Sequence, residues 1–161
     1  MDDSTQATYA AGLALLARRE LTAFQLRDRL RRRGHASDAI DAAVTRLLSE
    51  RALDDERAGA AIARHELVTR GHGLLRASRR LQEAGVALDL ARHILDRLSA
   101  DLDPDALLQA ALEKRIRRGT TVTDRKAFQR LYRHLVGRGF EPDRVLAALR
   151  RRSKLGDTDE S

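Results

Sequence analysis

The sequence predicts an all-α protein, and three observations lead to that fold class. The 161 residues include only five aromatic side chains, so the core must be built mainly from Leu, Ala, Ile and Val, which suit helix-on-helix packing. The β-branched and aromatic residues that favour strands are sparse. Glycines recur where amphipathic runs end, a pattern typical of left-handed helix caps. We therefore expect nine helices and no sheet.

The first third of the chain predicts three helices. Apolar residues spaced by four and three mark the expected buried face of the first helix, which is Tyr9, Leu13 and Leu16. Thr22 and Gln25 form a capping-box pattern at the start of the second helix, because each side chain can satisfy an unpaired backbone N–H. Gly34 should end that helix, and Ser37 should cap the third. The third helix is expected to bury Ile40, Val44, Leu47 and Leu48.

The middle third repeats this pattern. Asp54 or Asp55 begins a fourth helix, whose expected buried residues are Ala58, Ala61 and Ile62. Gly71-His72-Gly73 is expected to stop that helix and to act as a flexible joint. A short fifth helix with Leu81 buried should end at Gly85. The sixth helix is expected to bury Ala91, Ile94, Leu95 and Leu98.

The last third predicts three more helices. Asp103 and Pro104 suit the cap and first position of the seventh helix, which should stop at Gly119. Thr123 or Asp124 caps the eighth, and Pro142 begins the ninth. The expected apolar faces are Leu108, Leu112 and Ile116, then Phe128, Leu131, Tyr132 and Leu135, then Val145, Leu146 and Leu149.

The closing glycines indicate an internal repeat. They lie 51 and 54 residues apart, at Gly34, Gly85 and Gly139. A leucine precedes each glycine by four residues, and apolar residues follow it at six and ten. We therefore predict three tandem three-helix modules in an elongated arrangement, straight or curved. Their predicted bounds are 1–53, 54–102 and 103–155, with an acidic tail at 156–161.

The chain is basic, and its charge is uneven. It carries 31 Lys and Arg against 24 Asp and Glu, a net charge of +7. Residues 106–161 alone have a net charge of +7, whereas residues 54–105 have −2. This asymmetry indicates a polyanionic partner that the last third of the chain binds most strongly.

Runs of basic residues are the candidate contacts to such a partner. We single out Arg31, Arg32, Arg33, Arg79, Arg80, Lys114, Arg115, Arg117, Arg118, Arg133, Arg138, Arg150, Arg151 and Arg152. The alternative is that these cations only stabilise helix ends through the helix dipole, and for Arg79 and Arg80 the two interpretations are equally strong. Phosphate contacts would favour affinity over sequence specificity. Aromatic residues are nearly absent between the runs, so base stacking is not indicated.

Several classes of protein are excluded. A chain without cysteine has no disulfide scaffold and no thiolate metal site. No apolar run approaches the ~20 residues that a membrane span needs. The acidic N-terminus lacks the apolar segment of a signal peptide, so we expect a cytoplasmic location.

The sequence also lacks the residue patterns of an enzyme. It has no P-loop, and Gly71-His72-Gly73 lacks the third glycine of a dinucleotide-binding loop. The aspartates from Asp101 to Asp105 lack the glycine and glutamate of a calcium loop. The five histidines have no metal-binding spacing and are expected on the surface. We predict no catalytic, cofactor-binding or metal-binding residue.

Four segments carry a resemblance to a known family. They are Ala14-Leu15-Leu16-Ala17-Arg18-Arg19-Glu20 with Leu26 to Leu30, then Leu53-Asp54-Asp55, then Arg70-Gly71-His72-Gly73 with Arg76, Leu81 and Gly85, and finally Leu135-Val136-Gly137-Arg138-Gly139-Phe140. In order and spacing, over residues 9–150, they resemble the RecX family of recombination regulators. The chain departs from the family pattern at Ala58, where Phe is usual, and at Leu74, where Pro is usual.

The resemblance implies a regulator without catalytic activity. RecX-like proteins consist of three stacked three-helix modules that bind RecA and the RecA–DNA filament. The resemblance implies that this protein limits filament growth and suppresses the ATPase, coprotease and strand-exchange activities of RecA. We expect the protein to be a monomer. The alternatives are a nonspecific or helix-turn-helix DNA-binding module, or a helical adaptor for another acidic protein.

Overall fold

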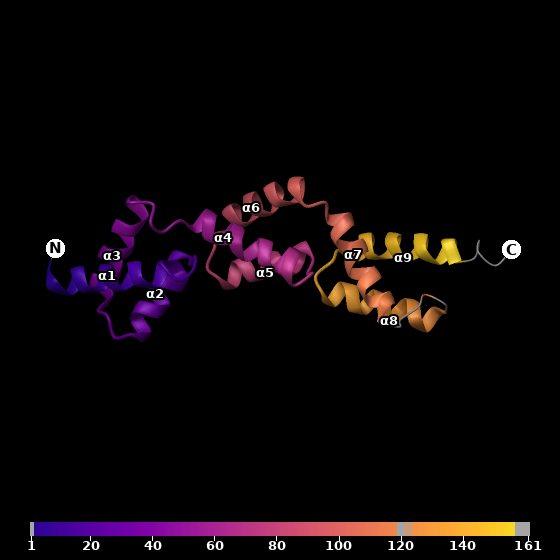
Figure 1. Cartoon of the computed structure of the whole chain (residues 1–161), viewed down its shortest axis with the longest axis horizontal. Coiled ribbons are helices and arrows are strands. Elements are labelled where there is room, and N and C mark those ends of the chain that lie inside the picture. Colours follow the sequence, from indigo (N-terminus) through magenta and orange to yellow (C-terminus); the bar gives the residue numbers. More distant parts are fainter. Residues whose placement is uncertain (1, 119–121, 123, 157–161) are drawn as a thin grey trace. The chain divides into compact units, whose positions relative to one another are not determined.

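The computed structural model of the chain describes residues 2–118, 122 and 124–156. Over these residues it contains nine α-helices and no strand (Figure 1), which confirms the all-α prediction. The helices are α1 (Asp3–Leu16), α2 (Ala23–Arg32), α3 (Ser37–Ser49), α4 (Asp55–Arg64), α5 (Leu74–Glu83), α6 (Leu88–Asp101), α7 (Pro104–Arg117), α8 (Arg125–Gly137) and α9 (Pro142–Gly156). One turn of π-helix, η1 (His65–Thr69), follows α4 directly.

The chain divides into two compact units. The first comprises residues 1–62 and 81–94, and the second comprises residues 63–80 and 95–161. The three-module boundaries at residues 53, 102 and 155 stay a prediction. Residues 157–161 of the expected acidic tail, Gly119 and Thr123 lie outside the described residues.

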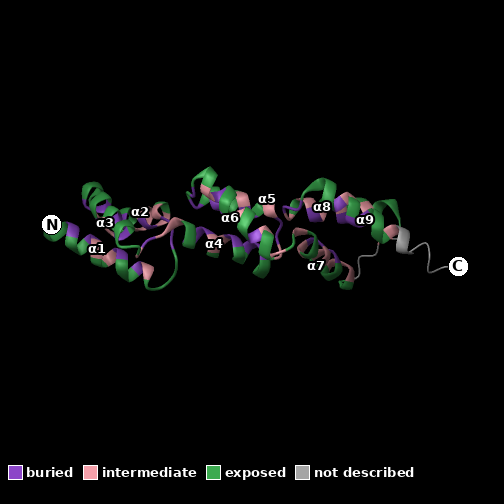
Figure 2. Ribbon diagram, turned by 90° about the horizontal axis from the view of Figure 1, so that it is seen from above, coloured by how far each residue is buried: buried purple, intermediate pink, exposed green. Residues whose placement is uncertain are grey.

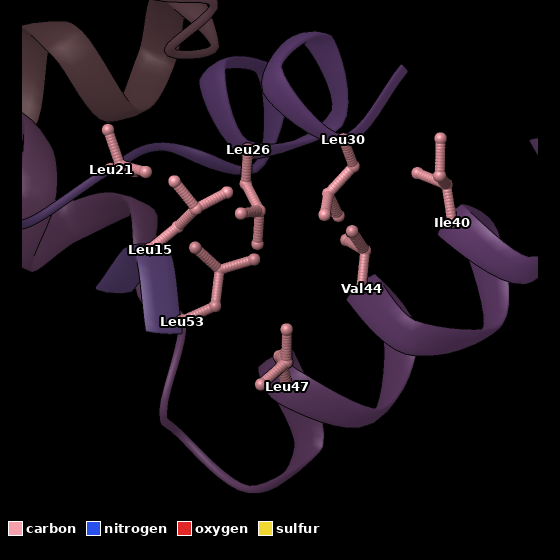
Figure 3. Packing of buried hydrophobic residues seen from close by; sticks show 8 residues of the cluster. All are labelled: Leu15, Leu21, Leu26, Leu30, Ile40, Val44, Leu47 and Leu53. Atoms are coloured by element: carbon pink, nitrogen blue, oxygen red, sulfur yellow. The ribbon is translucent and has the colours of Figure 1, made fainter. Parts of the chain in front are cut away.

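The first unit contains a leucine-rich core between α1, α2 and α3 (Figure 3). Its buried members are Leu15, Leu21, Leu26, Leu30, Ile40, Val44, Leu47 and Leu53. Purple stretches on these helices in Figure 2 mark the buried sides, and the opposite sides are exposed. Leu48, which was predicted to be buried, is instead 42% exposed.

The buried face of α1 differs from the prediction. The residues that pack are Thr5, Thr8, Gly12 and Leu15, whereas Leu13 is 38% exposed. A Cβ atom on Gly12 would lie 2.9 Å from Cδ1 of Leu47, so the absence of a side chain lets α3 approach closely. Close packing at Gly12 therefore sets the orientation of α1, while Tyr9 and Leu16 are half-buried beside the core.

Polar groups on this face are satisfied. The Thr8 hydroxyl lies 2.8 Å from the Ser4 carbonyl and 2.8 Å from Nδ1 of His35. The Tyr9 hydroxyl donates to Glu50 at 2.5 Å, and the Arg46 guanidinium lies 3.9 Å from the centre of the Tyr9 ring. These contacts join the outer edge of α1 to α3.

Several predicted helix caps are present. Thr22 and Gln25 form the reciprocal capping box, and the fully buried Thr22 hydroxyl also donates to the Ala84 carbonyl at 2.5 Å. Asp124 caps α8 through the Ala127 N–H. The prediction for Ser37 was wrong: Ser37 is the first residue of α3, and Ala36 occupies the cap without a side-chain hydrogen bond.

The three repeat glycines share one backbone geometry. Gly34, Gly85 and Gly139 have φ angles of +85°, +77° and +92°. After each glycine, the next N–H donates to the carbonyl of the leucine four residues before that glycine, at 3.2, 3.0 and 3.3 Å respectively. This is the Schellman motif, and its leucines are fully buried in all three copies, at Leu30, Leu81 and Leu135.

The helix that follows each glycine packs back as the repeat predicts, with one exception. The residues six positions later are buried, and they are Ile40, Ala91 and Val145. Ten positions later, Val44 and Leu149 are buried, but Leu95 is only half-buried. The repeat in residue spacing along the sequence therefore corresponds to a repeat in the structure.

Small residues on α4 allow close packing in the first unit. Ala58 is fully buried, and a Cβ atom on Gly59 would lie 2.6 Å from Cδ1 of Ile94. The stripe predicted on this helix was partly wrong, because Ala61 is exposed and Ile62 only half-buried. A glycine and an alanine, instead of larger apolar side chains, set the helix separation here.

The second unit has its own core between α7, α8 and α9. The buried members are Leu108, Leu112, Leu131, Leu135, Phe140, Val145, Ala148 and Leu149. Ile116, Phe128 and Tyr132 are half-buried at its edge. Asp103 accepts a hydrogen bond from the Asp105 N–H, and Pro104 occupies the first turn, as predicted.

Shortening a repeat leucine should loosen the core to which it belongs. We expect Leu30→Ala and Leu135→Ala each to lower the free energy of unfolding by about 2–5 kcal/mol, because each leaves a cavity. Hydrogen exchange should then rise first in α1–α3 for Leu30→Ala and in α7–α9 for Leu135→Ala. Leu13→Ala, at an exposed position of α1, is the matched control and should change stability by about 0.5 kcal/mol or less. A uniform rise of exchange along the chain in both core variants would contradict this prediction.

Candidate nucleic-acid interface

The basic residues singled out from the sequence are mostly on the surface. Arg115 and Arg138 are half-buried, and the others are exposed. Consecutive basic residues point in different directions around a helix, so the members of one run face different parts of the protein surface. Two groups of cations nevertheless converge on cavities, one in each unit.

The first group, which we call the N-terminal arginine cluster, lies where α1 ends beside α2. A cavity of about 360 Å³ is lined by Leu15, Arg18, Arg19, Arg29, Arg32 and Arg33. Burial lowers the pKa of Arg29, and the neighbouring charges of Arg19 and Arg33 lower it further. Arg32 lies 2.8 Å from the Asp28 carboxylate, so this cluster is partly neutralised.

The second group, which we call the C-terminal cationic cavity, lies in the second unit between α7, the end of α8 and the segment after η1. Its volume is about 220 Å³. The lining residues are Val68, Thr69, Arg70, Gly71, Leu107, Ala110, Ala111, Lys114, Arg115, Arg118, His134 and Arg138. No acidic residue is among the described residues that line it.

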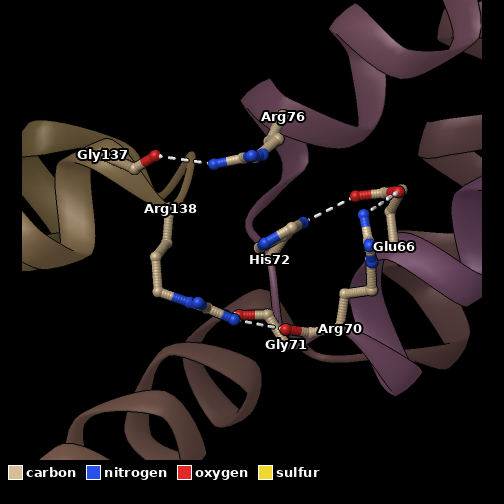
Figure 4. A network of polar contacts seen from close by, with 7 residues as sticks. All are labelled: Glu66, Arg70, Gly71, His72, Arg76, Gly137 and Arg138. Carbon is tan, nitrogen blue, oxygen red and sulfur yellow. Dashed lines mark hydrogen bonds and ion pairs between the residues drawn. The ribbon is translucent and has the colours of Figure 1, made fainter.

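Arg138 is held in place by the backbone. It caps the C-terminus of α8, and its guanidinium donates through Nε to the Gly71 carbonyl at 3.3 Å and through Nη2 to the Arg70 carbonyl (Figure 4). The Arg138 carbonyl accepts a hydrogen bond from the Gly73 N–H at 2.9 Å. The end of α8 and the segment after η1 therefore each donate hydrogen bonds to the other.

A buried pair supports the segment on the other side. His72 Nδ1 lies 2.6 Å from Oε2 of Glu66, and the two residues are 6% and 4% exposed. The His72 N–H also donates to the Glu66 carbonyl at 3.0 Å. The prediction that all five histidines lie on the surface was wrong for His72, because a carboxylate in η1 provides its partner.

The sequence predicted that Gly71-His72-Gly73 stops the helix and forms a flexible joint. The second part of this prediction was wrong. Gly71 does stop the helix, with φ +64°. However, His72 and Gly73 are buried, and a Cβ atom on Gly73 would collide with the backbone of Gly139 and lie 2.5 Å from the Phe140 nitrogen. Backbone packs directly on backbone here, so the segment is tightly packed.

The cavity repels further positive charge. Burial lowers the pKa of His134, and the nearby cations Arg115 and Arg138 lower it further. The pKa of Arg138 is lowered by burial, then by Arg76 and Arg118. The charged forms of both groups are therefore disfavoured, as expected where cations gather in a partly buried space without a lining carboxylate.

The fold thus selects a few of the candidate residues. Lys114, Arg115, Arg118 and Arg138 meet in the C-terminal cationic cavity, and Arg32 and Arg33 belong to the N-terminal arginine cluster. The remaining candidates line neither cavity, and they are Arg31, Arg79, Arg80, Arg117, Arg133, Arg150, Arg151 and Arg152.

Sequence reasoning missed five lining residues, the arginines Arg18, Arg19, Arg29 and Arg70 and the histidine His134. Helical spacing offered a signal for one of them, because Arg29 precedes Arg32 and Arg33 by three and four residues. Arg70 gave no local signal, since a turn brings it to the cavity.

Comparison with known proteins identifies the family that shares this architecture. Residues 9–47 match the model described as RecX, first three-helix domain, and residues 101–149 match RecX, third three-helix domain. The regulatory protein RecX of Halorhodospira halophila is 35% identical over 90% of this chain and 88% of its own length. The chain belongs to the RecX family.

Other RecX proteins agree with this assignment. RecX of Acidithiobacillus ferrooxidans is 35% identical, over 92% of this chain and 94% of its own length. The crystal structure of RecX from Lactobacillus salivarius has the same fold, with a TM-score of 0.82, 20% identity, and coverage of 96% of this chain and 99% of that one. RecX proteins carry the name of regulatory proteins, which is the function class that the sequence predicted.

The close approach at Gly73 leads to a testable prediction. We expect Gly73→Ala to lower the free energy of unfolding by about 1–3 kcal/mol or more, because the added methyl group overlaps backbone atoms that cannot rotate away. Chemical denaturation measures this change. Gly137→Ala is the matched control: its Cβ atom meets nothing within 4 Å, and at the end of α8 it should be neutral or slightly stabilising. Equal effects of the two substitutions would contradict the packing described here.

Proposed function

We propose that this RecX-family protein regulates RecA by binding RecA and the RecA–DNA filament, and that it thereby restrains the ATPase, coprotease and strand-exchange activities of RecA. The observation that supports this proposal is membership of a family of regulatory proteins, combined with two cavities lined by arginine. In this proposal the protein acts in the cytoplasm as a monomer of three helical modules and performs no catalysis.

Charge supports a contribution from DNA phosphates. The exposed cations on α7 and α9 would neutralise phosphates without reading bases, because arginine at a surface contacts the backbone in any sequence. Restraint of a filament suits such binding, since a filament covers DNA regardless of its sequence. Among the described residues no helix is both long and apolar enough to cross a membrane.

The runner-up is a nonspecific or helix-turn-helix DNA-binding module that acts without RecA. Within α9, Arg144 would be a natural base contact, but it lies 2.8 Å from Asp105 and 3.7 Å from Glu141. On α3 the exposed side includes the acidic residues Asp38 and Asp41. A recognition helix needs free polar groups toward the major groove, so neither helix favours this alternative.

The regulatory role is tested directly by RecA turnover. Addition of the purified protein should lower the DNA-dependent ATP hydrolysis of RecA, and the protein alone should hydrolyse no ATP. A coupled spectrophotometric assay measures both rates. Unchanged RecA turnover at saturating protein would contradict the proposal, as would ATP hydrolysis by the protein alone that a point substitution abolishes.

The contribution of phosphate contacts is tested by the salt dependence of DNA binding. Replacing Arg117, Arg150 and Arg151 by Gln should reduce the slope of log affinity against log salt by roughly 2–3 units, at about 0.7–0.9 per contact. All three residues are exposed and line neither cavity.

The matched control for this experiment is the triple substitution of Arg79, Arg80 and Arg92 by Gln, in the acidic middle third of the chain. Arg76 is left intact, because it donates to the Gly137 carbonyl at 3.2 Å and is part of the packing. The control should change the slope less. Equal slopes for all three proteins would mean that these arginines are not phosphate contacts.

A further inference from the structure

We propose that the C-terminal cationic cavity binds a phosphodiester group of a nucleic-acid backbone, with the phosphate between Arg115, Arg118 and Arg138 and the adjoining sugar against the apolar wall. This inference rests on the proposed function, because it assigns the DNA contact to a specific site. The arguments concern charge, size, rigidity and the response of one histidine.

The charge of the cavity is not balanced from within. Arg70, Lys114, Arg115, Arg118 and Arg138 contribute five cations, and no described lining residue is acidic. Outside the lining, Arg70 forms an ion pair at 3.8 Å with Glu66, whose buried carboxylate is shared with His72. Cations gathered in a partly enclosed space repel each other, and a bound anion removes that cost.

The size of the cavity limits the ligand. Pockets for drug-sized molecules measure about 300–1,000 Å³, whereas this cavity has about 220 Å³. A phosphate group and part of a sugar fit within that volume. Val68, Leu107, Ala110 and Ala111 form an apolar wall that suits the carbon atoms of a sugar.

One side of the cavity is rigid before any ligand binds. Two of the five N–H groups of the Arg138 guanidinium are occupied by the carbonyls of Arg70 and Gly71. These bonds fix the plane of the guanidinium and leave its other N–H groups for an anion. Because the side chain is already ordered, binding costs less conformational entropy there.

The guanidinium group also binds carboxylates, so an acidic segment of a protein is the competing ligand. The observations favour a phosphodiester for two reasons. Five cations converge on one small space, which suits the dense charge of a polynucleotide backbone. The apolar wall lies beside the cations, as a sugar lies beside its phosphate.

His134 provides an internal reporter of occupancy. It is half-buried, and the charged groups that line the cavity with it are Arg70 after η1, Lys114, Arg115 and Arg118 at the end of α7, and Arg138 at the end of α8. Burial and the neighbouring cations Arg115 and Arg138 hold its pKa below the ordinary value of 6.5. A bound phosphate stabilises the imidazolium, so the pKa of His134 should rise on binding. By linkage, binding should tighten as the pH falls through the pKa of the bound form.

The experiment is an NMR titration that follows the His134 ring proton, assigned with His134→Gln. The probes are a short oligothymidine, the same oligomer with uncharged methylphosphonate linkages, inorganic phosphate, ATP and an oligo-aspartate peptide. We expect the charged oligomer to shift the His134 resonance and to raise its pKa. The uncharged oligomer should do neither, and phosphate, ATP and the peptide should act only at much higher concentration.

Variants identify the residues responsible. Lys114→Gln with Arg115→Gln and Arg118→Gln should abolish the His134 response to the oligomer and reduce the salt slope of binding by roughly 2–3 units. The single substitution Arg118→Gln, at an exposed position, should weaken the response at least severalfold and keeps the test valid should the triple variant fold poorly. Arg79→Gln, Arg80→Gln and Arg92→Gln together form the control, because these residues do not line the cavity, and this variant should keep the His134 response.

The outcomes separate this inference from the proposed function. An unchanged His134 resonance with DNA binding and RecA inhibition intact would overturn the site and leave the function standing. A response to free phosphate, ATP or the peptide at concentrations as low as for the oligomer would overturn the phosphodiester assignment. If wild-type protein does not inhibit RecA although its His134 resonance still responds to the oligomer, the proposed function is overturned instead.

Discussion

The rest of the structure depends on one turn, which occurs three times. In each copy a buried leucine accepts a hydrogen bond from the residue after a glycine with positive φ. The bond satisfies a carbonyl that a helix end would leave unpaired, and the left-handed glycine reverses the chain. Because the leucine side chain and the next helix then meet at the same core, the turn fixes cap, direction and packing together. Three short helices whose buried residues are mostly leucines form a core in this way.

The third copy of the turn also builds the cationic cavity. Arg138 directly precedes Gly139, so the geometry that ends α8 also positions the guanidinium. The backbone after η1 packs on this turn: the N–H groups of Gly73 and Leu75 donate to the carbonyls of Arg138 and Gly139 at 2.9 and 3.1 Å. A side chain at position 73 would separate these segments. In the second unit, the same contacts therefore stabilise the turn and determine the geometry of the cavity.

Features with local sequence signals could be predicted, and features without them could not. The Leu–Gly spacing, the capping box at Thr22 and Pro104 at a helix start identified the fold, because each depends on residues a few positions apart. The face of α1 was missed because a glycine packs there while a leucine is exposed. The contact of Gly73 with Gly139 joins distant parts of the chain. The Glu66–His72 pair begins in a π-helical turn, which the 3.6-residue period of an α-helix does not predict.

The same distinction explains why runs of basic residues identify a candidate site poorly. Along α7, Arg117 and Arg118 are neighbours in sequence, yet only Arg118 lines the cavity, together with Lys114, which lies one turn earlier on the same side. Arg144 belongs to a basic segment, but Asp105 neutralises it. The attraction between a cationic site and a polyanion depends on the net positive charge that remains after neighbouring carboxylates are taken into account. In the described part of the chain no acidic residue lines the C-terminal cationic cavity, and its cations come from α7, the end of α8 and the segment after η1, so the site arises only when the fold brings distant residues together.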